Sequence, residues 1–349
     1  MWKLCLPYLA LPITHIINYC LSEGTFPSVW KIAKITPLAK VSSPKELKDL
    51  RPISILPCLS KVLEKTMVVQ IRHYVDHECV LPQMQSGFRA GYSCNTALAH
   101  VTDTIMSAID KNKLAVLVLT DYSKAFDTIS HNVLLAILEH IGFGTIATNL
   151  IRNYISSRFQ CVTLEREISH ALPVTVGVPQ GSVLGPLLYI IYTFDIINSI
   201  KYCTYHLYAD DTQLLHEFLP HETQNAVSNI NEDVQDLVEI SERHGLKINA
   251  QKCYVMLFGR AKIRKLIIPE IKIKIKDTPL PLVDNAKNLG LILDTDLRFK
   301  KHVSELLRKA YLNLKTLYNN RLILNRSLKI MLCESLVLSQ FSYCDNIYG

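Results

Sequence analysis

A continuous apolar segment, Leu114–Thr120, constrains the fold of this chain more than any other stretch. It has the length of a strand, and its lack of polar alternation predicts a strand that is buried on both faces of a sheet. The segment ends at Asp121, and a carboxylate at the exit of a buried strand is a strong candidate for a functional site. Helical and strand patterns mix without a regular βαβ period, so we expect an α+β protein.

Two adjacent carboxylates, Asp210 and Asp211, lie between apolar residues in the segment YADDTQL, residues 208–214. The flanks predict two strands joined by a hairpin link of four to five residues. Burying two like charges side by side is unfavourable, because each opposes ionisation of the other. A metal ion or a shared proton could offset this cost; the alternative is the solvated acidic tip of a hairpin.

The position of Asp121 favours the metal site. If its strand and the strands around Asp210 and Asp211 are neighbours in one sheet, three carboxylates converge. Carboxylate oxygens suit Mg²⁺, which binds a few carboxylates together with substrate phosphate. Two such ions, about 3.5–4 Å apart, can stabilise the attacking and leaving oxygens of a phosphoryl transfer.

The charge distribution points to a polyanionic partner. The net charge is +7, but residues 71–259 carry 12 Lys and Arg against 19 Asp and Glu, so both ends of the chain are basic. Basic ends suit a polyanion and an acidic centre suits metal cations, although ordinary surface charge could produce part of this asymmetry. Near the first basic end, Lys40 and Arg51 flank a polar loop between two short predicted strands, a unit that could hold phosphates.

Composition excludes several classes of protein. With 49% hydrophobic and 20% charged residues, the chain is globular rather than disordered. Its ten cysteines never form C-x-x-C, which argues against a disulfide framework and for a reducing compartment. His73 and His77, with Cys79 nearby, lack a fourth zinc ligand. No apolar window is long enough to span a bilayer, so we expect an intracellular protein, nuclear or cytoplasmic, that is not secreted.

Periodicity predicts most of the remaining elements. A glycine-rich loop at residues 174–186 should precede a long apolar helix, and the alternating Ile and Lys residues at 271–276 predict a half-buried strand. Helices are expected at 8–22, 60–78, 98–109, 131–141, 222–244 and 303–317, and strands at 30–40, 51–56, 254–258 and 291–293.

Ordered motifs identify a family resemblance. In chain order they are SVWKIAKITPLAK, RPISIL, QSGFRAGYSCNTAL, LTDYSKAFDTISH, GVPQGSVLGPLLY, YADDTQL, GLKINAQK and KNLGLILD. From Phe26 to about Val303 the chain resembles the reverse transcriptase domain of non-LTR retrotransposons, most closely of jockey-like elements. The resemblance implies a right-hand polymerase fold, with a helical extension over 1–24, fingers and palm over 25–293, and a partial thumb over 294–349. It also implies an RNA-directed DNA polymerase that uses an RNA template, a DNA primer and deoxynucleoside triphosphates.

The resemblance further implies roles for individual residues. Asp121, Asp210 and Asp211 would be the catalytic carboxylates that bind two Mg²⁺ ions, and the backbone carbonyl of Tyr122 would add a ligand. Lys252 matches the position proposed to protonate the pyrophosphate leaving group.

Further roles concern the nucleotide and the primer. Lys40 and Arg51 resemble the finger residues that hold the triphosphate. Phe126 matches the bulky residue that excludes a 2′-hydroxyl, and Gln180 is similar to the residue that lines the incoming nucleotide. The segment Lys287–Asp294 is similar to the primer grip, and the basic helix after it is similar to the start of the thumb.

Some features differ from the family pattern. Cys94 and Cys253 replace the usual hydroxyl residues, a change that we expect to adjust the activity rather than to abolish it. The chain has no room for an endonuclease domain before the fingers and stops soon after the thumb begins, so we expect a fragment or a truncated genomic copy. The alternative is therefore a non-catalytic nucleic-acid-binding remnant. An RNA-directed RNA polymerase is disfavoured by Phe126 and by the YADD form.

Overall fold

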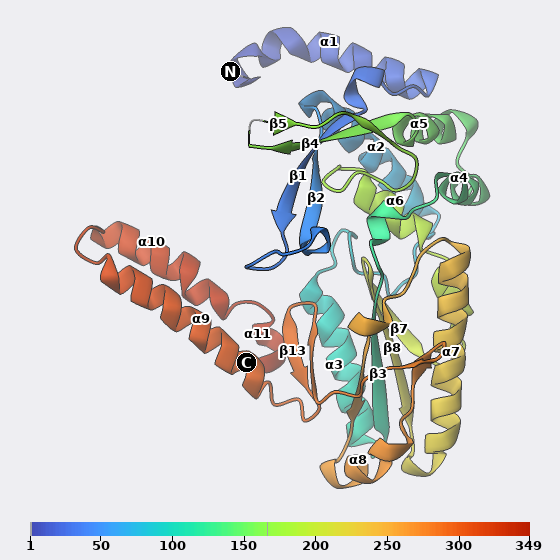
Figure 1. Cartoon of the computed structure of the whole chain (residues 1–349), viewed down its shortest axis with the longest axis vertical. Helices are drawn as coiled ribbons and strands as arrows, with labels where there is room; N and C mark the ends of the chain where they lie inside the picture. Colours follow the sequence, from blue (N-terminus) through green and yellow to red (C-terminus); the bar gives the residue numbers. More distant parts are fainter. Residues whose placement is uncertain (1, 166) are drawn as a thin grey trace. The chain divides into compact units, whose positions relative to one another are not determined.

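The computed structural model describes residues 2–165 and 167–349, which form two compact units (Figure 1). The first unit comprises 2–83, 123–197 and 240–247, and the second comprises 84–122, 198–239 and 248–349. The chain therefore passes repeatedly from one unit to the other. Both units combine helices with sheets, which confirms the α+β class.

The first unit contains a sheet in which the strands follow the order β2-β1-β4-β5, and β6 also pairs with β4. The predicted hairpin is confirmed, because β1 and β2 pair antiparallel. Ala33 and Ile35 alternate with exposed residues along β1 and pack with Leu56, as a half-buried strand should. The elements are α1 (Trp2–Glu23), β1 (Ile32–Ala39), β2 (Leu50–Ile55), α2 (Cys58–His77), α4 (His131–His140), α5 (Thr145–Ile155), β4 (Arg158–Leu164), β5 (Glu167–Ile168), β6 (Leu172–Val174) and α6 (Gly185–Tyr192).

Helix α6 is shorter than the sequence suggested. Its start is fixed by Glu64 of α2, whose buried carboxylate accepts hydrogen bonds from the backbone N–H groups of Val183 (2.7 Å) and Leu184 (3.2 Å). The helix ends at Tyr192, and the chain continues into a 3₁₀ turn at Ile196–Ser199. The prediction of a long apolar helix is wrong because apolar character here reflects complete burial rather than helix length.

The second unit is built on an antiparallel sheet in the order β7-β8-β3-β9. Strand β3 lies between β8 and β9 and is buried up to Asp121, which confirms the predicted central strand. The elements are α3 (Cys94–Asp110), β3 (Leu114–Asp121), β7 (Thr204–Tyr208), β8 (Asp211–Phe218), α7 (Thr223–Arg243, which belongs to the first unit from Ile240), β9 (Tyr254–Phe258), α8 (Ala261–Ile267), β10 (Lys274–Ile275), β11 (Thr278–Pro279), β12 (Asn285–Asn288), β13 (Leu291–Asp294), α9 (Lys300–Asn319), α10 (Arg326–Leu336) and α11 (Asp345–Tyr348).

Helices cover both faces of this sheet, with α3 on one side and α7 on the other (Figure 1). Leu98, Val101 and Ile105 of α3 pack with Leu117 of β3 and with Phe258 of β9 in one hydrophobic core cluster. Because successive residues of a strand point to opposite faces, β3 needs apolar residues throughout, which explains its unbroken apolar sequence.

The segment 271–276 only partly fulfils its prediction. Its isoleucines are buried and its lysines are exposed, as the alternation indicates. However, only Lys274–Ile275 forms a strand, paired with Thr278–Pro279. The side chain of Asn231 on α7 bonds to the backbone carbonyl of Lys272 and to the backbone N–H of Lys274, which holds the part of the segment around Ile273.

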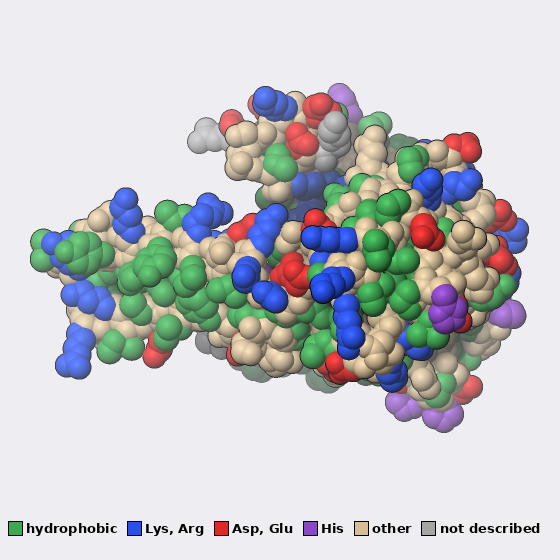
Figure 2. Space-filling model, turned by 90° about the horizontal axis from the view of Figure 1, so that it is seen from below, with side chains coloured by type: hydrophobic (Ala, Val, Ile, Leu, Met, Phe, Trp, Pro, Cys, Tyr) green, Lys and Arg blue, Asp and Glu red, His purple; other side chains and the backbone are tan. Residues whose placement is uncertain are grey.

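Helices α9 and α10 carry exposed apolar side chains. Figure 2 shows hydrophobic side chains gathered along this helix pair, with Lys and Arg at its margins. Leu306 and Ala310 of α9 are buried, whereas Tyr311, Leu314 and Tyr318 are exposed. In the part of the chain that the structure describes, no helix has both the length and the apolar character that a membrane crossing requires.

Candidate active site

A two-residue turn carries the adjacent carboxylates. Strands β7 and β8 are paired up to Tyr208 and Asp211, so only Ala209 and Asp210 form the link. The expected link of four to five residues is wrong, because Ala209 adopts a left-handed conformation (φ +56°) that permits a tighter turn. As a result, Asp211 is the first residue of β8 rather than part of a loop.

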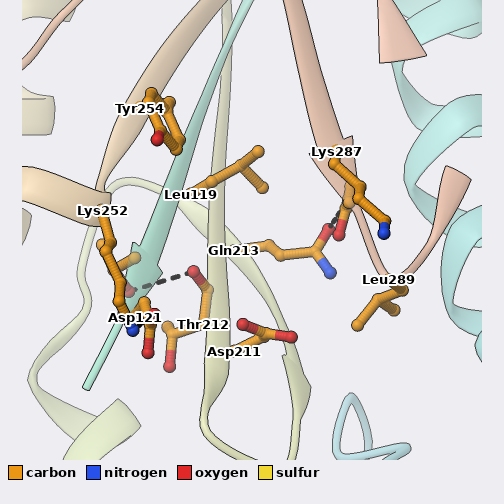
Figure 3. Close-up of a pocket in the computed structure, with 11 residues that line it drawn as sticks. Leu119, Asp121, Asp211, Thr212, Gln213, Lys252, Tyr254, Lys287 and Leu289 are labelled. Carbon is orange, nitrogen blue, oxygen red and sulfur yellow. Dashed lines mark hydrogen bonds and ion pairs between the residues drawn. The ribbon is translucent and has the colours of Figure 1, made fainter. Parts of the chain in front are cut away.

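Asp121 and Asp211 lie directly opposite each other in the register of β3 and β8. The pairing is reinforced by the Thr120 hydroxyl, which donates a hydrogen bond to the carbonyl of Thr212 (3.0 Å). The expectation that the two acidic segments belong to neighbouring strands is therefore confirmed. Figure 3 shows the two carboxylates on adjacent strands facing the same space.

Asp210, in the turn before Asp211, repels the Asp211 carboxylate. Burial, followed by repulsion from Asp210 and Asp121, raises the pKa of Asp211 to about 7. Within residues 2–165 and 167–349, no three His, Cys, Asp or Glu side chains are grouped so that they could hold a metal ion. The structure thus pairs two of the carboxylates and leaves the third in the adjoining turn.

Lys252 is brought to Asp121 by the turn that follows α7. Its Nζ atom lies 2.8 Å from Oδ2 of Asp121 (Figure 3). Lys252 ends a short 3₁₀ helix, Ala250–Lys252, and the N–H of Asn249 donates a 2.8 Å hydrogen bond to the backbone carbonyl of Asp121. Two residues separated by 131 positions are therefore held together by backbone contacts as well as by their charges.

Tyr122 is buried directly after the carboxylate strand. Its backbone pairs with Ile248 in an isolated antiparallel bridge, which extends the contact between β3 and the segment of Lys252. Its carbonyl is next to Asp121 in the chain, as the expected ligand role requires.

The cavity beside the carboxylates has further polar residues that sequence patterns did not single out. Gln213 is buried two residues after Asp211 on β8, and its Oε1 accepts a 2.8 Å hydrogen bond from Nδ2 of Asn288. The period of two in a strand places Gln213 on the face of Asp211, a signal that could have found it. The lining comprises Leu119, Thr120, Asp121, Asp211, Thr212, Gln213, Lys252, Tyr254, Lys287, Asn288 and Leu289.

Four nucleotide-binding candidates belong to the first unit. Arg51 is exposed on β2 opposite Leu38 of β1, and Lys40 is exposed just beyond the end of β1. The N–H of Lys40 donates a 2.7 Å hydrogen bond to the carbonyl of Asp49, which closes the intervening loop. Both cations therefore lie at the same end of the β1–β2 hairpin.

Phe126 and Gln180 are also neighbours within the first unit. The ring of Phe126 stacks on buried Tyr189, with centroids 4.8 Å apart. Gln180 donates a 2.7 Å hydrogen bond from Nε2 to Oδ1 of Asp127. A Cβ added at Gly177 would lie 2.8 Å from the carbonyl oxygens of Phe126 and Asp127. The close packing of the backbone at Gly177 against these oxygens therefore requires glycine. Sequence reasoning missed Asp127 and Tyr189, because neither belongs to a pattern that predicts contact.

The two cysteines that differ from the family pattern both lie near the carboxylates. A hydrogen bond with the Cys94 thiol is the main cause that raises the pKa of Tyr208 to about 12. The Cys253 thiol donates a 3.1 Å hydrogen bond to the carbonyl of Asn249. Cys94 therefore contacts the tyrosine side chain that precedes the carboxylate turn, and Cys253 contacts the backbone beside Lys252.

Comparison with known proteins identifies the family of the chain. A family model described as "Reverse transcriptase (RNA-dependent DNA polymerase)" matches residues 42–293. The "Probable RNA-directed DNA polymerase from transposon X-element" of Drosophila melanogaster is 29% identical over 97% of this chain and 37% of its own length. The similarly named protein "from transposon BS" of the same species is 31% identical over 91% of this chain and 35% of its own length.

The "RNA-directed DNA polymerase from mobile element jockey" of Drosophila melanogaster is 27% identical over 99% of this chain and 37% of its own length. The chain thus spans little more than a third of the curated relatives that it matches. These matches confirm the resemblance to jockey-like elements, and the family model covers most of the chain. The chain belongs to the reverse transcriptase family.

Proposed function

We propose that this chain is an RNA-directed DNA polymerase that adds deoxynucleotides to the 3′ end of a primer. The observation that carries the proposal is the register pair Asp121–Asp211, with Lys252 on Asp121, in a chain that belongs to the reverse transcriptase family. An RNA template, a DNA primer and deoxynucleoside triphosphates would be its partners. Its location would be intracellular, where these partners occur.

The proposed architecture is the right-hand polymerase fold. Residues 25–293 would supply fingers and palm, and the antiparallel sheet β7-β8-β3-β9 with its covering helices has the composition of a palm. Residues 1–24 would be a helical extension, in keeping with α1, and residues 294–349 would begin a thumb with α9 and α10.

The donor set fits divalent metal ions. Asp121, Asp210 and Asp211 are hard oxygen donors. Burial, followed by repulsion from the other two carboxylates, raises the pKa of Asp211, and bound cations would offset both effects. We propose that these carboxylates and the carbonyl of Tyr122 would hold two Mg²⁺ ions. When bound, such ions stabilise the negative charge of the attacking and leaving oxygens.

The protein's own contribution to the reaction is positioning and proton transfer. In primer extension the 3′-hydroxyl oxygen bonds to the α-phosphorus of the nucleotide, and the bond from that phosphorus to the pyrophosphate oxygen breaks. The hydroxyl proton would pass to solvent water, and Lys252 Nζ would give a proton to the departing pyrophosphate. Its contact with Asp121 keeps this ammonium group at the reacting centre before substrate arrives.

The residues of the first unit would select the nucleotide. Lys40 and Arg51, together on one hairpin, would bind the triphosphate, with Arg forming paired contacts and Lys acting as a point charge. Phe126 would block a 2′-hydroxyl with its stacked ring. Gln180, oriented by Asp127, would contact the nucleotide.

A primer-extension assay tests the proposal directly. The wild-type chain with Mg²⁺, an RNA template and a DNA primer should extend the primer, and Asp210→Asn should abolish extension. Asp103→Asn, an exposed carboxylate on α3, is the matched control and should extend normally. Full activity in Asp210→Asn would refute the proposed site. Salt-dependent binding without extension by the wild type would identify a non-catalytic nucleic-acid-binding protein instead.

A further inference from the structure

The glycine-rich segment 177–184 carries Gln180, and its backbone is bonded to the elements that carry other nucleotide-binding candidates. The N–H of Val178 donates a 2.9 Å hydrogen bond to the carbonyl of Phe126. The carbonyl of Gln180 accepts a 2.7 Å hydrogen bond from the N–H of Ser54 on β2, a strand of the hairpin proposed to bind the triphosphate. The position of this segment therefore sets where Gln180 lies relative to that hairpin and to Phe126.

The turn around Gln180 packs closely against β2. The N–H of Ser182 donates a 3.1 Å hydrogen bond to the carbonyl of Pro179, which closes the turn. Gly181 has φ +102°, and a Cβ there would lie 3.0 Å from the carbonyl oxygen of Ser54. Because so little space is left between the turn and the strand, a displacement at the end of the segment would shift Gln180 as well.

The end of the segment is anchored by Glu64 of α2, which is fully buried beside the start of α6 (Figure 1). Its Oε2 accepts hydrogen bonds from the N–H groups of Val183 (2.7 Å) and Leu184 (3.2 Å). The same oxygen accepts a 3.3 Å hydrogen bond from the Tyr154 hydroxyl, and Oε1 accepts one of 2.7 Å from the Ser60 hydroxyl. Four donors therefore converge on one buried carboxylate.

The charge of Glu64 has a buried counterpart in Arg158. Burying a carboxylate is costly unless it is paired and hydrogen-bonded. Arg158 is 3% exposed, and its guanidinium interacts electrostatically with Glu64 while Nη1 donates a 2.7 Å hydrogen bond to the carbonyl of Tyr154. Hydrogen bonds to an ionised acceptor are roughly twice as strong as those between neutral groups. Glu64 therefore holds the Gln180 segment more firmly than a neutral side chain would.

We propose that Glu64 is a positioning residue that sets the affinity for the incoming nucleotide without touching it. It acts through the N–H groups of Val183 and Leu184, which fix the backbone that carries Gln180. The inference rests on the proposed function, because it takes Gln180 to contact the nucleotide. Asp127 orients the amide of Gln180 at the same time, so backbone and side chain are both fixed before the nucleotide binds. Preorganisation of this kind lowers the entropic cost of binding.

Nucleotide affinity, measured without turnover on a primer that lacks its 3′-hydroxyl, tests this role. Gln180→Ala should raise the Kd for the complementary deoxynucleotide about tenfold, as expected for a lost hydrogen bond. Glu64→Met keeps the length of the side chain but removes both acceptor oxygens, and it should raise this Kd about fivefold. Glu64→Gln retains one acceptor oxygen and should restore most of the affinity. The Kd for primer–template should change less than about twofold in each variant. Glu78→Gln, an exposed glutamate at the end of α2, is the matched control and should bind the nucleotide like the wild type.

A double-mutant cycle separates positioning from a general structural role. If Glu64 acts through Gln180, Glu64→Met should change the nucleotide Kd less than about twofold in a chain that already carries Gln180→Ala. Thermal denaturation shows whether each variant is folded. If Glu64→Met fails to fold, Ser60→Ala takes its place, because it removes only the hydroxyl donor to Oε1. It should raise the nucleotide Kd about twofold, and only when Gln180 is present.

Hydrogen exchange observes the anchor itself, without any substrate. In Glu64→Met the amides of Val183 and Leu184 lose their acceptor, so they should exchange at least about tenfold faster than in the wild type. Amides of α4, which Glu64 does not contact, should exchange at the same rate in both proteins. Ser60→Ala should give a smaller increase at the same two amides.

Three results would overturn the proposal. One is unchanged exchange at Val183 and Leu184 in Glu64→Met, and another is an unchanged nucleotide Kd in that variant. The third is an equal rise in Kd with and without Gln180, which would make Glu64 purely structural. Binding is measured without turnover, so a wild type that binds the nucleotide but fails to extend the primer refutes the proposed function and leaves this test intact. A wild type that binds no nucleotide would refute both.

Discussion

Asp121 lies directly opposite Asp211 across β3 and β8, and only Asp121 has Lys252 within 2.8 Å. The pair is therefore electrostatically unequal. Asp121 has a neighbouring cation, while burial and two neighbouring carboxylates raise the pKa of Asp211 to about 7. Substitutions of the two residues should therefore have different effects.

The first prediction concerns stability against pH without metal. A folded-state pKa of about 7, above the ordinary 3.8, means that folding favours protonated Asp211. This stabilisation is complete below about pH 4 and is lost as the pH rises through 7. In EDTA, the free energy of unfolding of Asp211→Asn, relative to that of the wild type, should therefore rise by roughly 2 kcal/mol between pH 5 and pH 8. Urea denaturation at both pH values measures this change. A difference between the two proteins that does not depend on pH would contradict the prediction.

Magnesium should stabilise the folded chain through the same carboxylates. Ligands that bind only the folded state raise its stability by mass action. We expect Mg²⁺ at about ten times its dissociation constant to add roughly 1.4 kcal/mol to the free energy of unfolding of the wild type at pH 8. The gain should vanish in Asp121→Asn and persist in Asp103→Asn. Equal gains in all three proteins would show that Mg²⁺ binds elsewhere.

Lys252 should affect the chemical step more than substrate binding. Removing a general acid typically lowers a rate by a factor of about 10²–10⁴. Lys252→Met should lower kcat by a factor in this range at saturating Mg²⁺, with the KM for the nucleotide changed less than threefold. Lys247→Met, an exposed neighbour, is the control. A raised KM with normal kcat would instead make Lys252 a binding residue.

Sequence patterns predicted the elements that depend on local periodicity. The bounds of β9 and the central position of β3 follow from apolar runs. The tight turn at Ala209 was missed because its left-handed backbone is set by strand pairing rather than by a glycine. The Gln213–Asn288 bond joins residues 75 positions apart, and no local pattern encodes such a contact. The carboxylates were found because they follow or adjoin apolar strand segments, and motif order then identified the family, while their exact partners required the sheet register.

Phe126 should control the choice of sugar. In Phe126→Ala the stacked ring on Tyr189 is lost, and under the proposed role this change makes room for a 2′-hydroxyl. The ratio of kcat/KM for deoxynucleotides to that for ribonucleotides should fall by at least tenfold. Phe159→Ala, an exposed phenylalanine on β4, should leave the ratio unchanged. Unchanged sugar discrimination in Phe126→Ala would remove it from this role.

Gly87 should be essential for the geometry of the carboxylate turn. The loop that contains it pairs with β7, because the N–H of Leu207 donates to the carbonyl of Met84 and the N–H of Ser86 donates to the carbonyl of Leu207. A Cβ at Gly87 would lie 2.0 Å from the backbone nitrogen of Ala209. Contact this close with backbone must displace the turn, and with it Asp210 and Asp211.

We therefore expect Gly87→Ala to lower kcat by at least about 100-fold, since a displacement of about 1 Å at reacting groups can have this effect. Its melting temperature should fall as well, because the loop and β7 can no longer pair closely. Gly144→Ala is the matched control: a Cβ there meets nothing within 4 Å, and its φ of −66° suits alanine. Primer extension and thermal denaturation of both variants provide the test. Normal activity in Gly87→Ala would mean that the loop moves away and that the turn does not depend on it.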